Sequence, residues 1–199
     1  MKRKHKDCYS LRRKSEGKCV KYLLDTNAYF AVLRYIANNE KSDKVESILK
    51  EKCYISKVTQ IEIISVIGQY ARGQSRQTPV CDRIHADSNH PCGRQYLVEK
   101  RKKWSGAKIH DWLKMEHEIS TGINSRFQVT VLDITDEVLS EAKIFIQKAL
   151  IYNFKSMDAM ILGTAKAYSQ EGESIVIVTA DRGLRAGMTA IGYPFETIG

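Results

Sequence analysis

The chain has 199 residues, of which 43% are hydrophobic and 28% charged, with only 3 Pro. At about 150 residues per domain, this composition indicates one globular core with additions and excludes a disordered or fibrous chain. No apolar run reaches the length of about 18 residues that a membrane helix needs, and the basic start leads into no apolar signal segment, so we expect a cytoplasmic protein. The 5 cysteines are an odd number without an export signal, so no disulfide framework is expected.

The formal net charge of +9 is concentrated in two segments. Residues 1–19 carry eight Lys and Arg against two Asp and Glu, and residues 71–126 carry eleven against six. The rest of the chain carries thirteen basic and fifteen acidic residues. Basic segments attract polyanions such as nucleic acid, although a solvated basic surface gives the same composition.

The first part of the chain after residue 19 alternates strand and helix patterns. Apolar runs predict two buried strands, and helical periodicity predicts three helices, in the order strand 22–24, helix 28–37, helix 45–49, strand 53–56 and helix 58–70. The last of these helices carries Ile61, Ile64, Ser65 and Gly68 along one side.

The same alternation returns after residue 126. The expected order is strand 127–134, helix 138–150, helix 156–168, strand 175–179, a short helix and a final strand 195–198. Strands separated by helices imply crossover connections, so the predicted fold class is a three-layer α/β/α fold with a mostly parallel central sheet. We expect a basic N-terminal extension over 1–19 and one domain over 20–199, with an insertion at about 71–126.

The first half of the insertion is predicted to be a polar loop that runs to about residue 93. It contains two thiols and two imidazoles, from Cys81, His85, His90 and Cys92. This ligand set suits tetrahedral zinc, but the spacing matches no familiar zinc motif, so a loop without metal is the alternative.

The second half of the insertion is predicted to be a charged helix. Apolar residues lie near one face of it, namely Leu97, Trp104, Trp112, Met115 and Ile119. Such a stripe predicts packing on the body of the protein, with base stacking as the alternative. The adjacent basic run Arg101, Lys102 and Lys103 is a candidate RNA-binding segment, and a solvated helix face explains it equally well.

Four acidic residues from distant segments are expected at one edge of the sheet. Asp25 ends the first strand, and Glu62 lies early in the helix after the second strand. Asp158 begins a helix, and Asp181 follows the fourth strand. Ligands bind beyond the carboxyl ends of parallel strands, and clustered carboxylates require cations such as Mg²⁺ or Mn²⁺. The alternative is local: Asp25 and Asp181 cap helices, Thr59 and Glu62 form a capping box, and Asp158 interacts with its helix dipole.

The motifs around these acids resemble those of PIN-domain nucleases, above all bacterial VapC-like toxins. They are YLLDTN at 22–27, TQIE at 59–62, SMDAMILGTA at 156–165 and TADRGL at 179–184. The resemblance implies a PIN-like fold in which the catalytic and metal-binding set is Asp25, Glu62, Asp158 and Asp181. It also implies Asn27 and Thr179 as supporting polar residues.

The implied activity is hydrolysis of RNA phosphodiester bonds by an endoribonuclease that uses one or two Mg²⁺ or Mn²⁺ ions. By the same resemblance the protein is the toxin of a toxin–antitoxin module, with RNA as substrate, an antitoxin protein as partner and a homodimeric state. The alternatives are a housekeeping RNA-processing nuclease and an inactive RNA-binding or scaffold protein of the same fold.

Overall fold

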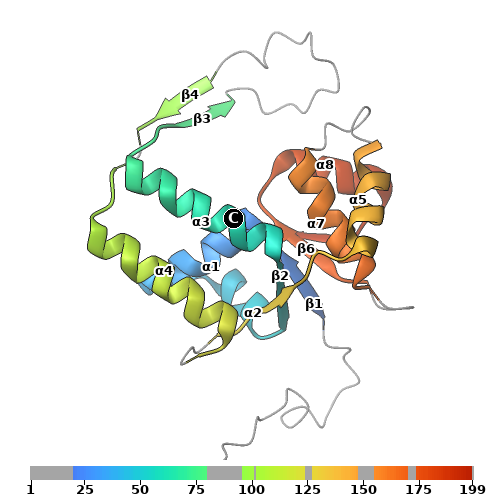
Figure 1. Ribbon diagram of the computed structural model, residues 1–199, viewed down its shortest axis with the longest axis horizontal. Coiled ribbons are helices and arrows are strands. Elements are labelled where there is room, and N and C mark those ends of the chain that lie inside the picture. Colours follow the sequence, from blue (N-terminus) through green and yellow to red (C-terminus); the bar gives the residue numbers. More distant parts are fainter. Residues whose placement is uncertain are drawn as a thin grey trace, which may run out of the picture.

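A central parallel sheet forms the middle layer of the protein (Figure 1). The computed structural model describes residues 20–79, 96–100, 102–123, 127–147, 155–169 and 174–198. The strands of the sheet are β1 (Lys21–Leu24), β2 (Lys52–Ser56), β5 (Thr130–Leu132), β6 (Val176–Thr179) and β7 (Phe195–Thr197). Their order is β5-β2-β1-β6-β7, and every neighbouring pair is parallel, which confirms the predicted fold class.

The order in which strands are added to the sheet reverses between β1 and β6, although the strands stay parallel. From β1 the chain builds outward through β2 to β5, and then returns to the other side of β1 to add β6 and β7. At such a reversal the connections after the two central strands diverge, which leaves room for a ligand at their carboxyl ends. Asp25 follows β1 directly, and Asp181 lies two residues beyond the end of β6.

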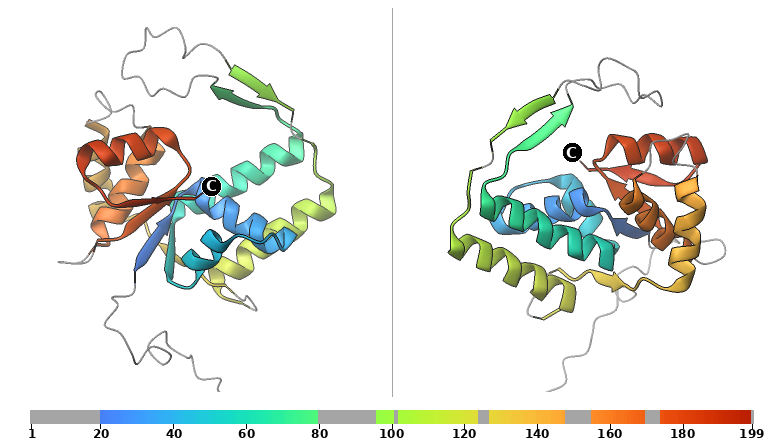
Figure 2. Two further views of the ribbon diagram at one scale, coloured as in Figure 1. Left: turned by 180° about the vertical axis from the view of Figure 1, so that it is seen from behind. Right: turned by 45° about the horizontal axis from the view of Figure 1, so that its top comes forward.

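Helices cover both faces of the sheet (Figures 1 and 2). One face carries α1 (Thr26–Asn38), α2 (Asp43–Leu49), α3 (Lys57–Arg72) and α4 (Gly106–Thr121). The other carries α5 (Asp136–Gln147), α7 (Ser156–Ala167) and α8 (Arg182–Ile191). Each face of the sheet packs a separate hydrophobic core against its helices. Because successive strand residues point to opposite faces, Leu24 lies in the core beneath α1, α2, α3 and α4, and Leu23 lies in the core beneath α5, α7 and α8.

The helix α7 packs closely on α5, and this contact positions the start of α7 at the sheet edge. A Cβ atom at Gly163 would lie 2.6 Å from the backbone oxygen of Val138 and 2.7 Å from the backbone nitrogen of Ala142. Only glycine therefore permits this approach. Within the described part of the chain, no helix is long and apolar enough to cross a membrane.

The insertion differs from the prediction in its first half. Residues of β3 (Arg76–Pro79) pair antiparallel with β4 (Tyr96–Glu99), so a hairpin extends from the end of α3 (Figure 2). Leu97 lies in β4, and Trp104 precedes α4, so placing these two on the helical face was wrong. The helix begins later because Ser105 caps it, accepting a hydrogen bond from the Lys108 backbone N–H at 3.3 Å.

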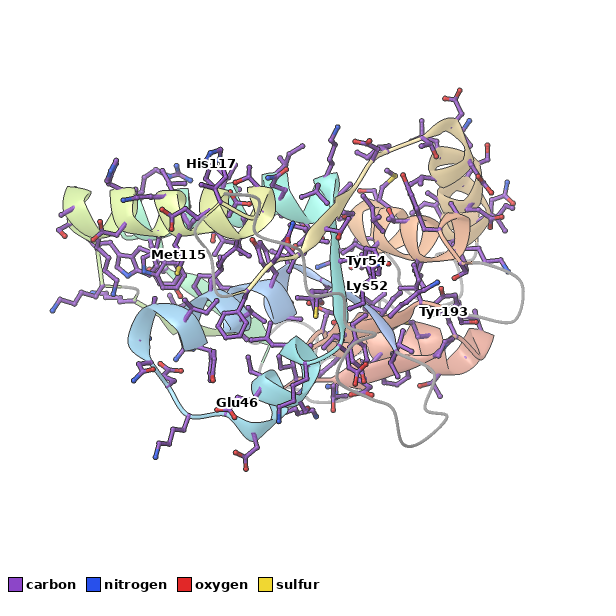
Figure 3. All side chains as sticks on the ribbon, turned by 90° about the horizontal axis from the view of Figure 1, so that it is seen from below. Glu46, Lys52, Tyr54, Met115, His117 and Tyr193 are labelled. Carbon is purple, nitrogen blue, oxygen red and sulfur yellow. The ribbon has the colours of Figure 1, made fainter. Side chains whose placement is uncertain are left out.

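The helix α4 does pack on the body as predicted, through aromatic side chains. The Trp104 ring stacks on the Tyr70 ring with centroids 4.3 Å apart. The centroid of the Trp112 ring lies 4.6 Å from that of the Trp104 ring. The Lys108 ammonium lies 4.7 Å above the Trp104 ring. These contacts favour packing over base stacking for Trp104. Figure 3 shows Met115 on the side of α4 that faces α1.

The sequence singled out one side of α3, and the structure leaves that side exposed. Ile61 and Ile64 are 65% and 49% exposed, whereas Ile63 and Ile67 are buried in the core. Isoleucines on both sides satisfy helical spacing, so periodicity alone does not decide which side faces the core.

Candidate active site

The structure brings the four predicted acids together at the reversal of the sheet. Asp25 and Asp181 are the N-caps of α1 and α8, Asp158 is the third residue of α7, and Glu62 lies in the second turn of α3. Burial raises the pKa of Asp25 and that of Asp158. The charges of Asp158 and Asp181 raise the pKa of Asp25 further, and those of Asp181 and Glu62 raise the pKa of Asp158 further. Four segments far apart in sequence therefore form one acidic cluster.

Asp25 is the buried member of the cluster, with a side chain only 4% exposed. Its Oδ1 accepts a hydrogen bond from the Ala28 backbone N–H at 2.7 Å, and its Oδ2 accepts one from the Thr179 hydroxyl. Burial raises the pKa of Asp25 to about 6, and the two hydrogen bonds oppose this rise because they favour the charged form. The charge of Asp25 is thus costly in the absence of a cation.

Thr179 joins two of the acids. It is fully buried, its hydroxyl donates to Asp25, and the same oxygen accepts a hydrogen bond from the Asp181 backbone N–H at 2.9 Å. Thr179 thus holds Asp25 relative to the start of α8, and its supporting role in a site stays a prediction. Asn27, the other predicted supporting residue, is exposed in the first turn of α1.

Glu62 does not form the capping box that was the alternative for it. The N-cap of α3 is Ser56, whose hydroxyl accepts from the Thr59 backbone N–H at 3.0 Å, so Glu62 lies beyond the first turn. Its Oε2 instead accepts a hydrogen bond from the Thr26 hydroxyl on α1. Sequence reasoning missed Thr26, because only the packing of α1 beside α3 gives it this partner.

The local alternative holds in part for the other acids. Asp181 Oδ1 accepts from the Leu184 backbone N–H at 2.8 Å, and Asp158 Oδ2 accepts from the Lys155 backbone N–H at 3.0 Å. Each aspartate uses one oxygen for its own helix, as Asp25 does with Ala28. Capping thus fixes the Asp158 and Asp181 side chains through one carboxylate oxygen each, and the other oxygen takes no part in the capping bond.

Hard oxygen donors that repel one another suit a divalent cation such as Mg²⁺ or Mn²⁺. Among the residues that the structure describes, no three carboxylate, imidazole or thiol groups are grouped closely enough to enclose a metal ion as they stand. The donor chemistry therefore fits a hard cation, and binding one would require the acidic side chains to draw closer together.

The remaining predicted site residues lie away from this cluster or outside the described ranges. Lys102 and Lys103 are exposed just before α4. The extension 1–19 lies outside the described residues, as do Arg101 and the zinc candidates Cys81, His85, His90 and Cys92. The zinc site and the role of the extension stay predictions.

A parallel α/β sheet whose strand order reverses places a ligand site at the carboxyl ends of its two central strands, where these acids lie. Residues 22–187 match the PIN domain, so the chain belongs to the PIN-domain family, as its motifs predicted. Comparison with curated protein sequences finds no match.

Two solved structures share the fold at low identity. VapBC from Salmonella typhimurium, crystallised with DNA bound, has 19% identity and a TM-score of 0.51, over 89% of this chain and 98% of that chain. FitAcB from Neisseria gonorrhoeae has 14% identity and a TM-score of 0.50, over 87% of this chain and 95% of that chain. At these identities the likeness establishes the shared fold alone.

Proposed function

We propose that this PIN domain is a metal-dependent endoribonuclease that hydrolyses RNA phosphodiester bonds. Its catalytic and metal-binding residues would be Asp25, Glu62, Asp158 and Asp181. The observation that carries the proposal is the convergence of these like charges around a buried aspartate whose pKa is raised to about 6. Such an arrangement is costly for stability alone and is typical of sites that bind cations.

The chain's own residues would hold the acids in place. Thr179 fixes Asp25 relative to the start of α8, and Thr26 fixes Glu62 against α1. When bound, Mg²⁺ or Mn²⁺ would activate a water molecule and neutralise the charge that develops in an in-line displacement at phosphorus. The carboxylates would supply the ligands that hold the ion at the carboxyl ends of β1 and β6.

We further propose that the protein is the toxin of a toxin–antitoxin module, that an antitoxin is its protein partner and that it forms a homodimer. Support comes from the motifs that resemble VapC-like toxins and from the shared fold with VapBC and FitAcB. A housekeeping RNA-processing nuclease is the alternative, and a neighbouring gene for a small DNA-binding antitoxin would distinguish the two. An inactive scaffold is less well supported, because all four acids are present and their charges act on one another.

A cleavage assay with Mg²⁺ or Mn²⁺ tests the enzymatic part of the proposal. Asp158→Asn should lower the rate on the order of 100-fold or more, because it removes a charge from the site at constant volume. The matched control is Asp133→Asn, which changes an exposed acid that is paired with Lys57 outside the cluster and should retain the wild-type rate. Full activity of Asp158→Asn, or cleavage that persists in chelator, would contradict the mechanism.

A further inference from the structure

A buried hydroxyl at the start of α3 lies next to the end of β1, and the mechanism proposed above does not use it. The Thr59 side chain is fully buried, and its Oγ1 donates a hydrogen bond to the backbone oxygen of Leu24 at 3.4 Å. Leu24 is the last residue of β1, and Asp25 follows it directly. Thr59 therefore contacts the backbone immediately before the buried acid of the cluster.

The hydrogen bonds around Thr59 have one consistent direction. The Thr59 backbone N–H donates to the Ser56 hydroxyl oxygen at 3.0 Å, and the two hydroxyl oxygens lie 3.1 Å apart. A hydroxyl has one hydrogen to donate, so when Thr59 donates to Leu24, the Ser56 hydroxyl donates to Thr59. Ser56 is also fully buried. Loss of the Thr59 hydroxyl would thus remove a partner from two buried groups, which is costly.

Thr59 and Thr26 form crossed links between the same two segments. Thr26 follows Asp25 in the chain, and its hydroxyl donates to Glu62 on α3. Thr59 lies on α3, and its hydroxyl donates in the opposite direction, to Leu24 at the end of β1. The segment that carries one acid is therefore tied to the helix that carries the other by a side chain from each.

The peptide bond between Leu24 and Asp25 is held from two neighbouring elements. On the β6 side, the Asp25 backbone N–H donates to the Val178 oxygen at 3.0 Å. On the α3 side, Thr59 bonds the Leu24 oxygen. Because Glu62 lies on α3 three residues after Thr59, this second contact bears on the spacing of the backbones that carry Asp25 and Glu62.

We propose that Thr59 is a positioning residue for the metal site. Its hydroxyl fixes the backbone of Asp25 relative to that of Glu62, so that a divalent cation meets its ligands at a set spacing. This inference rests on the proposed nuclease function and adds to it a buried residue that acts through the backbone. Binding an ion requires the acidic side chains to draw closer together, and fixed backbones leave that movement to the side chains alone.

The test is Mn²⁺ binding by Thr59→Val, measured by titration calorimetry beside the wild type. Thr59→Ser is the rescue variant, because it keeps the hydroxyl and removes only a methyl group. The matched control is Thr164→Val, since Thr164 is also fully buried and its hydroxyl also donates to a backbone oxygen, that of Met160 on α7 at 2.8 Å.

Unfolding by denaturant in chelator checks that each protein is folded before Mn²⁺ is added. Should Thr59→Val not fold, Thr59→Ala is compared with Thr59→Ser, from which it differs by the hydroxyl alone. This second pair keeps the comparison between a side chain with the hydroxyl and one without it.

Groups behind the metal ligands typically contribute about 10- to 100-fold to metal affinity. Thr59 acts through the backbone, so Thr59→Val should weaken Mn²⁺ binding about 10-fold, at the lower end of this range. Thr59→Ser and Thr164→Val should bind Mn²⁺ with nearly the wild-type affinity. In cleavage assays, Thr59→Val should need about 10-fold more Mn²⁺ for half of its maximal rate and should keep the wild-type KM for RNA.

If the wild type binds Mn²⁺ and cleaves RNA but Thr59→Val binds the ion equally well, the inference is wrong and the nuclease function stands. Equal losses of affinity in Thr59→Val and Thr164→Val, or no recovery in Thr59→Ser, would also overturn the inference, because the hydroxyl contact would not be the cause. A wild-type chain that neither binds Mn²⁺ nor cleaves RNA would overturn both.

Discussion

Two buried carboxylates, Asp25 at the sheet edge and Glu116 on α4, show how differently two regions of this protein use a charge. Their side chains are 4% and 5% exposed, and burial raises the pKa of both. Asp25 is surrounded by other acids, whose charges raise its pKa further. Glu116 is surrounded by groups that lower its pKa, including the Gln60 amide, which donates to Oε1 at 3.2 Å.

The comparison teaches that burial of an acid is not by itself evidence of a functional site. Glu116 is explained by its place between α4 and α3, where an amide satisfies it within an apolar and aromatic interface. Asp25 also caps α1 and accepts from Thr179, but its surroundings add the repulsion of neighbouring acids to the cost of burial, and neither of these bonds requires those acids. Convergence of like charges therefore separates the proposed active site from a buried structural acid.

The largest expected effect is on RNA cleavage, which substitution of Asp25 should lower strongly and substitution of Glu116 should leave unchanged. Asp25→Asn should lower metal-dependent RNA cleavage on the order of 100- to 1000-fold, because it removes a charge that the site is built around. Glu116→Gln keeps the shape and one hydrogen-bonding oxygen, and it should leave kcat and KM close to wild type. Initial rates at several RNA concentrations measure both. A large loss in Glu116→Gln would show that α4 takes part in the chemistry.

The next effect is on stability as a function of pH. Asp25 has a folded pKa of about 6 against an ordinary value of 3.8, so its protonation favours the folded state. That contribution is fully present below pH 3.8 and is lost as the pH rises through 6, a change of about 3 kcal/mol. In chelator, Asp25→Asn should therefore unfold at higher denaturant concentration than wild type at pH 7.5, with a smaller difference at pH 5.

Mg²⁺ provides the control for this stability prediction. A ligand that binds only the folded protein stabilises it, so Mg²⁺ should raise the melting temperature of the wild type much more than that of Asp25→Asn. Equal unfolding midpoints of the two proteins at both pH values would show that the Asp25 charge is already compensated without metal.

The smallest expected effect concerns the aromatic contacts that hold α4. Trp104→Ala removes the stack on Tyr70 and the contact with Trp112, and should lower the free energy of unfolding by about 2 kcal/mol because the ring is half-buried. Leu113→Ala, at an exposed position on α4, should cost much less. An unchanged melting temperature of Trp104→Ala together with weaker RNA binding would restore base stacking as the role of this residue.

The central elements of the fold could be predicted from the sequence because their signals are local. Apolar runs mark β1, β2 and β6, and Asp25 and Asp181 mark helix starts that the structure confirms. The hairpin of β3 and β4 could not be found in this way. Its strands are short and are separated by residues 80–95, so their pairing depends on a contact between distant segments.

The sequence by itself determined the strand and helix alternation, the positions of four acids next to strand and helix ends, and the motifs of the PIN-domain family. These features depend on periodicity, capping and residue order, which a short segment contains in full. Only the tertiary structure decided that Thr26 bonds Glu62, that Ile63 rather than Ile61 enters the core, and that burial, with the neighbouring acids, raises the pKa of Asp25. Each of these depends on which surfaces the sheet and helices bring together, because burial and charge coupling arise between segments that are far apart in the chain.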